Sequence, residues 1–430
     1  TPGPTLPPTP NPTPVPTSSP TSKWDRILAD HQPYHPQAYE WVMTTDTWEP
    51  DPSLRADPDE LYLERYAIAT LYYSFVPSGG SWFTQGAEAW MTANNHCDWY
   101  NVQCDDNGRV NSFSGSSSEL EGTLPTEVGL LTQMTELLFF FNDLTGVIPT
   151  QIGALTNLSF VTLGRNGFTG TIPTEMGALT KLTYLDATSN RFTGSLPTEL
   201  GLLSQLTALS LESNQFAGTI PTEFGRFAVV QYLWLHDNFI ASSIPSEIGL
   251  LTDTLELRLD GNFLRGQIPT TLGSLTAVTS LNLTAGFMEG PIPTEIGLLS
   301  QLEELYLGDN SLRGTIPTEF GNLANLWGLN VYENSLFGPI PTEIGNMLSL
   351  EEFAAWRNDL SGTIPSEFQS LIILTLLDLG INSLTGSIPP LPTSLTTCYL
   401  AESYDGFEEG NCFTDTSQNP DQCSIVSNCI

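Results

Sequence analysis

Twelve prolines share one register, each 24 residues after the last, and this period restricts the chain to very few folds. Counting back from each proline gives the pattern LxxLxxLxLxxNxFxGxIP, of which residues 299–317 are one full copy. A repeat this short cannot bury its apolar side chains alone, so the period predicts a solenoid of stacked coils. The prolines are Pro125, Pro149, Pro173, Pro197, Pro221, Pro245, Pro269, Pro293, Pro317, Pro341, Pro365 and Pro389.

The columns of the repeat predict its local structure. Alternating residues such as Leu305 and Leu307 predict a short strand with inward leucines, while Glu304 and Tyr306 point outward on the concave side. An inward asparagine can hydrogen-bond to backbone groups where the chain bends. That column is interrupted at Ser118 and Gly286, and we expect weaker coils there. Its asparagines are Asn142, Asn166, Asn190, Asn214, Asn238, Asn262, Asn310, Asn334, Asn358 and Asn382.

A Thr column and a Glu column follow the prolines, as in Pro317-Thr318-Glu319. We expect each threonine to cap the short turn that follows and each glutamate to sit at its positive end. Coils about 4.8 Å apart place neighbouring carboxylates where they repel by roughly 1 kcal/mol in water. A stripe that collects cations or docks a partner is the alternative. An ice-binding face, which regular threonine rows would permit, is disfavoured because charged glutamates run beside the threonines.

Four segments are expected along the chain. Residues 1–22 are a Pro/Thr-rich stalk that favours polyproline II and offers candidate O-glycan acceptors. Residues 23–109 form an N-terminal cap with a helix that starts at Asp57. In that helix Ile68, Leu71, Tyr72 and Phe75 mark one buried stripe. Residues 110–396 are the repeats, and residues 397–430 are a cysteine-rich C-terminal cap.

The repeat and the cap together resemble a known family. GxIP is the hallmark of plant-type leucine-rich repeats, which carry CxWxGVxC before the first repeat, where this chain reads CDWYNVQC. Asn101 replaces the usual glycine, which is tolerable because asparagine visits left-handed φ. The spelling IPTEIG is most similar to algal members. The resemblance implies an α/β solenoid, a right-handed superhelix of about 12 coils with a parallel sheet on the concave face and disulfide-bonded caps.

Charge and motif content exclude several function classes. The chain has 48 acidic and 13 basic residues, a formal net charge of −35, so nucleic acid and anionic membrane are poor partners. Its four histidines lie in no recognisable nucleophile or zinc motif, and we expect neither an enzyme nor a metal site. No cofactor is expected beyond weak Ca²⁺ binding on the acidic surface. The sequence contains no run of about 18 apolar residues, so no segment is predicted to insert into a membrane.

Cysteines and glycosylation sequons indicate an extracellular or cell-surface protein. All six cysteines lie outside the repeats, as in an oxidised protein with disulfide-bonded caps. The pairings Cys412–Cys423 and Cys398–Cys429 are preferred among three possibilities for the C-terminal cap. Asn157 and Asn282 head N-glycosylation sequons, and the glycan on Asn282 would divide the concave face. The cysteines are Cys97, Cys104, Cys398, Cys412, Cys423 and Cys429.

Aromatic residues gather at two places on the predicted concave face. Exposed aromatics beside carboxylates suit sugar rings or the anchor side chains of a partner protein, because stacking and directed hydrogen bonds act together. The alternative is that these large side chains only cover one another. The predicted binding residues are Tyr232, Trp234 and His236 in the first group, and Tyr306, Trp327, Tyr332 and Trp356 in the second.

These features favour a non-enzymatic extracellular interaction scaffold that joins protein or glycan partners. One version assembles with copies of itself, the stalk of one subunit docking on the next, which gives filaments unless the contact closes. A second hypothesis is the ligand-binding ectodomain of a receptor whose membrane part is absent from this sequence. A third is a secreted inhibitor of wall-degrading enzymes, similar to the plant polygalacturonase inhibitors. Fold does not decide among them.

Overall fold

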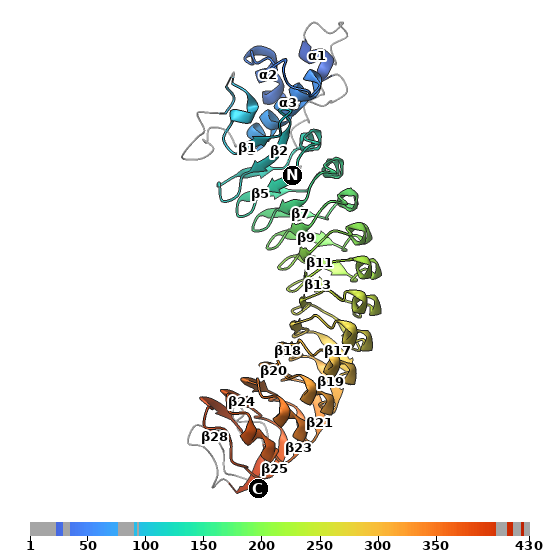
Figure 1. Ribbon diagram of the computed structural model, residues 1–430, viewed down its shortest axis with the longest axis vertical. Coiled ribbons are helices and arrows are strands. Elements are labelled where there is room, and N and C mark those ends of the chain that lie inside the picture. Colours follow the sequence, from blue (N-terminus) through green and yellow to red (C-terminus); the bar gives the residue numbers. More distant parts are fainter. Residues whose placement is uncertain are drawn as a thin grey trace, which may run out of the picture.

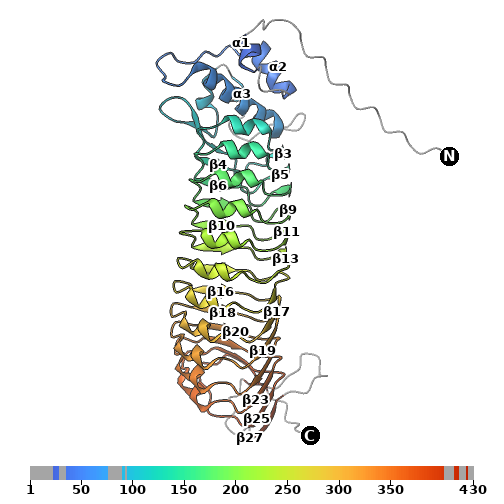
Figure 2. The same ribbon diagram turned by 90° about the vertical axis from the view of Figure 1, so that its right-hand side faces the viewer.

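The computed structural model describes residues 23–28, 35–75, 90–92, 94–400, 411–415 and 423–424. The chain is a right-handed solenoid whose coils stack along a curved axis (Figure 1), which confirms the predicted fold class. A long sheet lines the concave side, and short 3₁₀ helices stack along the convex side (Figure 2). The stalk, residues 1–22, lies outside the described residues.

The main sheet has 15 strands, one from each coil with further strands at both ends. Its strands pair in parallel except for the antiparallel pair β1 and β2. In chain order they are β1 (Val102–Cys104), β2 (Val110–Ser114), β4 (Glu136–Leu138), β6 (Phe160–Thr162), β8 (Tyr184–Asp186), β10 (Ala208–Ser210), β12 (Tyr232–Trp234), β14 (Glu256–Arg258), β16 (Ser280–Asn282), β18 (Glu304–Tyr306), β20 (Gly328–Asn330), β22 (Glu352–Ala354), β24 (Leu376–Asp378), β26 (Thr397–Tyr399) and β28 (Cys423–Ser424).

A second strand in each coil builds two lateral sheets, of six and seven strands. The first holds β3 (Glu121–Thr123), β5 (Asp143–Gly146), β7 (Gly167–Gly170), β9 (Arg191–Gly194), β11 (Gln215–Gly218) and β13 (Phe239–Ile240). The second holds β15 (Arg265–Gly266), β17 (Phe287–Gly290), β19 (Ser311–Gly314), β21 (Ser335–Gly338), β23 (Asp359–Gly362), β25 (Ser383–Ser387) and β27 (Cys412–Asp415).

The division between the two lateral sheets has a local cause. Four residues after the inward asparagine, the other coils carry a glycine with φ between 74° and 99°. Residues other than glycine rarely adopt such φ values. In the coil of β13 this position is Ser242, whose φ is not positive. The chain therefore takes another path there, β13 ends after two residues, and the sheet is interrupted before β15.

The convex turns differ from the prediction in one respect. Within the repeats, each 3₁₀ helix begins at the Thr column, and the preceding proline is the N-cap residue without a side-chain cap bond. The threonine hydroxyl instead donates to the following glutamate, at 3.2 Å for Thr318 and Glu319, so the predicted capping role of threonine is wrong. The helices are η2 (His96–Asp98), η3 (Thr126–Leu130), η4 (Thr150–Ala154), η5 (Thr174–Ala178), η6 (Thr198–Leu202), η7 (Thr222–Arg226), η8 (Ser246–Leu250), η9 (Thr270–Ser274), η10 (Thr294–Leu298), η11 (Thr318–Asn322), η12 (Thr342–Asn346) and η13 (Ser366–Ser370).

The inward asparagines form the hydrogen-bond ladder that the sequence predicts. Asn238 accepts the Phe216 N–H through Oδ1 at 3.0 Å. Its Nδ2 donates to the carbonyl oxygens of Leu211 at 3.0 Å, Leu235 at 3.2 Å and His236 at 3.1 Å. One side chain thus satisfies backbone groups of its own coil and of the preceding coil, which would otherwise be buried without partners. We call these asparagines the asparagine ladder.

The asparagine ladder has one interior gap and an end that the sequence analysis missed. Gly286 has no side-chain amide. Within the described residues, the Leu264 N–H therefore has no asparagine side-chain oxygen to donate to. At the other end, Asn411 accepts the Leu384 N–H at 2.8 Å and so closes the last coil. Asn411 follows Asn382 by 29 residues instead of 24, so the period does not find it.

In the repeats, from residue 117 to residue 381, the residue before the ladder position adopts positive φ, whatever its type. The values run from 46° at Glu333 to 62° at Gly261, and they include 51° at the β-branched Ile381. This conformation costs an ordinary residue about 1 to 2 kcal/mol. The hydrogen bonds of the asparagine that follows offset that cost, because the left-handed residue is what turns the asparagine inward.

Three helices form the N-terminal cap: α1 (Lys23–Ile27), α2 (Pro36–Thr44) and α3 (Pro58–Phe75). The predicted start of α3 is confirmed, since Asp57 accepts the Asp59 N–H at 2.9 Å. The sequence predicts one buried stripe along this helix, but the buried surface is wider, because nearly every residue of α3 from Leu61 to Leu71 is buried. The cap covers the helix on several sides, and α1 and α2 both contact it.

The cap holds a buried charge that hydrogen bonds fully satisfy. Arg65 is inaccessible to solvent, and its Nε and Nη2 donate to the two carboxylate oxygens of Asp46, each at 2.7 Å. Its guanidinium also lies 4.8 to 5.1 Å from the ring centres of Trp41, Trp48 and Trp99. A buried ion pair is tolerated when its geometry and hydrogen bonds are this complete.

Disulfides close both ends of the solenoid. Cys97 is bonded to Cys104, and Asn101 between them has a φ of 64°, as its replacement of glycine requires. At the other end Cys398 is bonded to Cys423, so the preferred pairings Cys398–Cys429 and Cys412–Cys423 are wrong. The reason is that β26 and β28 are neighbours in the main sheet, which places Cys398 opposite Cys423. Cys412 is also disulfide-bonded, and Cys429 lies outside the described residues.

The asparagine ladder predicts that replacing a ladder asparagine destabilises the protein far more than replacing an exposed one. We expect Asn238→Ala to lower the free energy of unfolding by about 2 to 4 kcal/mol, because it leaves several buried backbone groups unpaired. The matched control is Asn325→Ala, since exposed Asn325 donates one hydrogen bond, to the Ser300 carbonyl. Urea unfolding followed by circular dichroism measures both changes. Equal losses at the two positions would contradict the role assigned to the asparagine ladder.

Candidate functional site

The main sheet arranges outward side chains of successive coils in columns on the concave face. Strands pair residue by residue, so that Ser210 in β10 lies opposite both Asp186 in β8 and Trp234 in β12. Outward residues that are 24 apart in the sequence are therefore neighbours in space. A site on this face is built from several coils, with one or two side chains from each.

The first predicted aromatic group is present on the concave face. Tyr232 and Trp234 pack edge to face with ring centres 5.6 Å apart. The indole N–H of Trp234 donates to a carboxylate oxygen of Glu256 at 3.1 Å, which fixes the ring toward the next coil. His236 follows two residues later and points to the same face.

The second predicted group is brought together only in part. Tyr332 and Trp356 stack with ring centres 5.1 Å apart and planes 13° from parallel, as their shared column predicts. Tyr306 belongs to the neighbouring outward column, in β18. Trp327 precedes β20, and among the described residues its ring contacts neither Tyr332 nor Trp356.

Beside the first group lies a hollow that the aromatic pattern did not predict. Its volume is about 340 Å³, and β8, β10 and β12 supply its floor. We define the carboxylate pocket by Asp186, Ser210, Glu212, Trp234 and His236, all of which line this hollow. Further lining residues are Phe140, Arg165, Tyr184, Thr188, Ser189 and Ser213.

Several polar atoms in the carboxylate pocket have no hydrogen-bond partner in the described protein. They are the Ser210 hydroxyl, Oε2 of Glu212 and Nδ1 of His236, and all three atoms are buried. Ser210 is only 2% exposed. Buried polar atoms without partners are uncommon and costly in a folded protein, so a group of them at one hollow indicates a place where a ligand completes the hydrogen bonding.

Asp186 is the most deeply placed carboxylate of the pocket. It is 6% exposed, and its Oδ1 accepts the Thr188 N–H at 2.9 Å. A Cβ atom on Gly164 would lie 2.7 Å from that oxygen, so the absence of a side chain at 164 makes room for the carboxylate. Burial, the largest cause, and the charge of Glu212 together raise the pKa of Asp186 to about 6, against the opposing effects of the Thr188 N–H and of Arg165.

The sequence analysis missed three of the five pocket residues, Asp186, Ser210 and Glu212. Large aromatic side chains stand out on the predicted concave face, whereas these three residues are acidic or small. The signal was present in the columns, because Asp186 and Ser210 share the column of Trp234, and Glu212 shares that of His236. Phe160 and Tyr184, which stack at 4.4 Å beside the pocket, were also missed.

The two sequon asparagines occupy different surroundings. Asn282 lies in β16 on the concave face, as predicted, where its side-chain oxygen accepts the Thr284 N–H at 3.1 Å. It lines a second hollow of about 430 Å³, between the two aromatic groups. Asn157 donates to the Thr132 carbonyl at 3.0 Å and accepts from Lys181 at 2.7 Å. Whether either asparagine carries a glycan stays a prediction.

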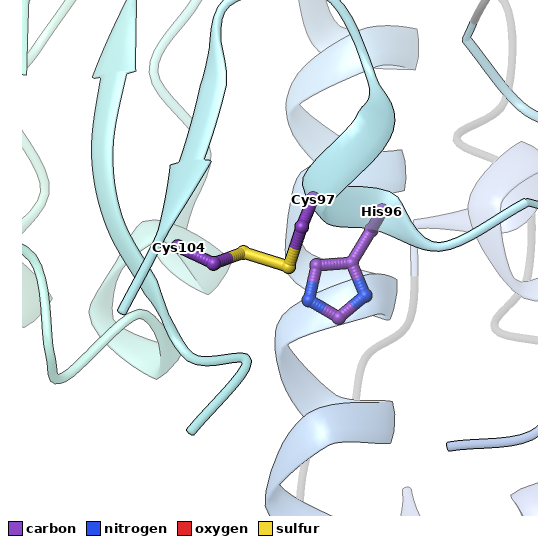
Figure 3. Close-up of side chains that lie close together, drawn as sticks. All are labelled: His96, Cys97 and Cys104. Carbon is purple, nitrogen blue, oxygen red and sulfur yellow. A yellow bond between two sulfur atoms is a disulfide. The ribbon is translucent and has the colours of Figure 1, made fainter. Parts of the chain in front are cut away.

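One cluster of metal-ligating residue types occurs among the described residues, in the N-terminal cap. His96 lies beside Cys97 and Cys104 (Figure 3), but the two sulfur atoms are bonded to each other and offer no thiolate. Burial, the largest cause, and the charge of Arg65 together lower the pKa of His96 to about 3, so the imidazole is neutral. This cluster is a packed disulfide and carries no metal chemistry.

The raised pKa of Asp186 predicts a pH-dependent stability cost. Its carboxyl is more easily protonated in the folded chain than in the unfolded chain, so ionisation destabilises the fold as the pH rises from about 4 through 6. At pH 7.5 we expect Asp186→Asn to raise the free energy of unfolding by up to about 3 kcal/mol. Near pH 4 the variant and the wild type should be equally stable.

Thermal melting of the wild type and Asp186→Asn at both pH values measures this effect. Asp359→Asn, at an exposed aspartate on β23, is the control and should leave the melting temperature unchanged at either pH. A stabilisation by Asp186→Asn that is the same at pH 4 and pH 7.5 would show that ionisation is not its cause.

Comparison with known proteins agrees with the architecture. A family model described as Leucine Rich Repeat matches residues 181–203, 205–227 and 301–323. A search of curated protein sequences finds no match. Among the residues that the structure describes, no helix combines the length and apolar character that crossing a bilayer requires.

Solved structures give closer matches. The Arabidopsis receptor kinase HAESA, solved in complex with the peptide hormone IDA and the co-receptor SERK1, is 28% identical over 85% of this chain and 61% of that chain, with a TM-score of 0.69. A plant ice-binding protein is 26% identical over 77% of this chain and 97% of its own, with a TM-score of 0.52. The chain spans between 50% and 61% of the length of the plant receptor chains that it resembles.

A bacterial structure covers most of both chains. A leucine-rich-repeat protein of Leptospira interrogans is 30% identical over 69% of this chain and 77% of that chain, with a TM-score of 0.53. The residues that the family model matches lie in the repeats. The chain belongs to the leucine-rich repeat family.

Proposed function

We propose that this protein is a non-enzymatic extracellular scaffold that binds a segment of a partner protein along its concave face. The observation that carries the proposal is the carboxylate pocket, where the buried Ser210 hydroxyl and two other polar atoms lack partners beside aromatic rings. Aromatic anchors around incompletely satisfied polar groups are typical of protein-binding surfaces. HAESA, similar to this chain, was solved with a peptide hormone, which supports a peptide segment as the occupant.

The disulfides support the extracellular location. Cys97–Cys104 and Cys398–Cys423 are formed, and no cysteine of the described chain is free. Such pairing is typical of oxidising compartments. The receptor-ectodomain and inhibitor hypotheses are special cases of the same scaffold. Self-assembly through the stalk rests on residues 1–22, which lie outside the described part of the chain, and it stays a prediction.

Ice binding is the activity named for one structural relative, and it is not favoured here. The convex threonine hydroxyls donate to glutamate carboxylates, at 3.0 Å for Thr126 and Glu127 and 3.2 Å for Thr342 and Glu343. A row of charged carboxylates beside the threonines binds water and ions in many arrangements and does not present a regular hydroxyl surface. The concave face is therefore the better candidate for recognition.

A library of displayed linear peptides, selected on the purified protein, tests the proposal. We expect selected peptides to bind the concave face, so Trp234→Ala or Trp356→Ala should weaken their binding by about tenfold or more, the usual effect of losing an aromatic anchor. Phe337→Ala is the matched control, because Phe337 is 53% exposed on the lateral strand β21. Biolayer interferometry with synthetic versions of the selected peptides measures the affinities.

The asparagine at 282 needs its own control, because a glycan there would cover part of the face. The selection should be repeated on Asn282→Gln, which removes the sequon. Peptides whose affinity is unchanged in both tryptophan variants, with and without Asn282, would show that the concave aromatics take no part in binding.

A further inference from the structure

We propose that the carboxylate pocket binds a positively charged side chain, the guanidinium of arginine or the ammonium of lysine, presented by the bound segment. The inference rests on the proposed function, since it names the chemical class that the concave face would read at one position. Three observations carry it: two carboxylates without ion-pair partners, an excess of unused hydrogen-bond acceptors, and flanking aromatic rings.

The first observation is that neither carboxylate of the pocket is neutralised. Among the described residues Asp186 and Glu212 form no ion pair, and the carboxylate of Asp186 has one hydrogen bond, from the Thr188 N–H. Arg165 lines the same hollow, but its guanidinium lies over the Phe140 ring at 5.6 Å and forms no ion pair. A buried carboxylate is stable when a cation accompanies it, so the pocket is incomplete as it stands.

The next arginine along the concave face is already paired. Arg258, in the next coil, donates to both carboxylate oxygens of Asp260, at 3.1 and 3.3 Å. Burial lowers the pKa of His236, and Arg258 lowers it further, so its ring is neutral at pH 7. The carboxylates of Asp260, Glu212 and Asp237 oppose this shift. The protein therefore contributes net negative charge to the pocket and its surroundings.

The second observation concerns which hydrogen-bonding groups are unused. Oε2 of Glu212 is an acceptor only, the Ser210 hydroxyl accepts as well as donates, and Nδ1 of the neutral His236 accepts in one tautomer. A guanidinium supplies five N–H donors in a plane and an ammonium supplies three. A neutral sugar would also donate hydrogen bonds, but it would leave two buried carboxylates without a counter-charge, and so the cation fits better.

The third observation is the aromatic wall. Tyr184 and Trp234 line the hollow on either side of Ser210 along the sheet. The Trp234 ring is held in place by its hydrogen bond to Glu256. Aromatic rings attract guanidinium and ammonium groups more strongly than neutral ones, which favours the same class of side chain.

Two blocked tripeptides test the inference on the purified full chain. The probes are acetyl-Gly-Arg-Gly-amide and the same peptide with citrulline, which keeps the shape of arginine but is neutral. We expect the arginine peptide to bind at least about tenfold more tightly, because it pairs with charged acceptors. Titration followed by saturation-transfer NMR measures both affinities.

Matched variants assign the binding to the pocket. Asp186→Asn combined with Glu212→Gln should weaken binding of the arginine peptide by about tenfold or more. Asp378→Asn is the control. Asp378 is a half-buried aspartate of the main sheet that, like Asp186, accepts a backbone N–H two residues on and has its pKa raised to about 6 by burial. Binding by Asp378→Asn should equal that of the wild type.

Several outcomes overturn the inference. They are equal binding of the arginine and citrulline peptides, no binding of either, or the same loss in Asp378→Asn as in the double variant. Binding of cellohexaose that the double variant abolishes, with no arginine binding, would show a glycan site instead. Selected library peptides that lack basic residues yet depend on Trp234 would overturn this inference and leave the proposed function intact.

Discussion

The asparagine ladder is the interaction on which the rest of this structure depends. After each concave strand the chain bends, and the bend leaves backbone donors and acceptors facing a dry interior. One amide per coil satisfies them, as Asn238 does through one oxygen and one nitrogen. It also joins each coil to the preceding one, because half of its partners lie there. The left-handed residues that precede the asparagines, Ile381 among them, persist because these bonds offset their cost.

Regular stacking is what turns scattered residues into a surface. Asp186, Ser210 and Trp234 are 24 residues apart in the sequence, and the sheet register places them side by side. The interior columns vary little, since nearly every coil carries asparagine at the ladder position and an apolar residue at the inward positions. Outward columns carry no such requirement, so they vary, and their variation holds whatever specificity the protein has. The convex threonines and glutamates repeat more regularly, which fits a role in the turns.

The chain contains two buried charges in different surroundings, one that stabilises the cap and one at the proposed binding site. Arg65 is enclosed in the cap with both Asp46 oxygens and three tryptophan rings around it, so its charge is compensated within the fold. Asp186 is nearly as enclosed, yet its carboxylate accepts one backbone hydrogen bond and forms no ion pair among the described residues, and burial is the largest cause that raises its pKa to about 6. Natural folds tolerate incomplete compensation mainly where function needs it. The contrast between the two sites is the physical basis for placing binding at the concave pocket.

The sequence by itself determined the solenoid, its 24-residue coil, the asparagine ladder, the start of α3 and the adjacency of Tyr332 and Trp356, because each follows from periodicity or from local backbone chemistry. Only the tertiary structure decided the rest. It paired Cys398 with Cys423, since the choice among cysteines depends on which strands become neighbours. It placed Asn411 on the asparagine ladder after the period had ended. It also gathered Asp186, Ser210 and Glu212 around one hollow. Burial and the lack of hydrogen-bond partners arise only when several coils pack together, so they cannot be read from the sequence of one repeat.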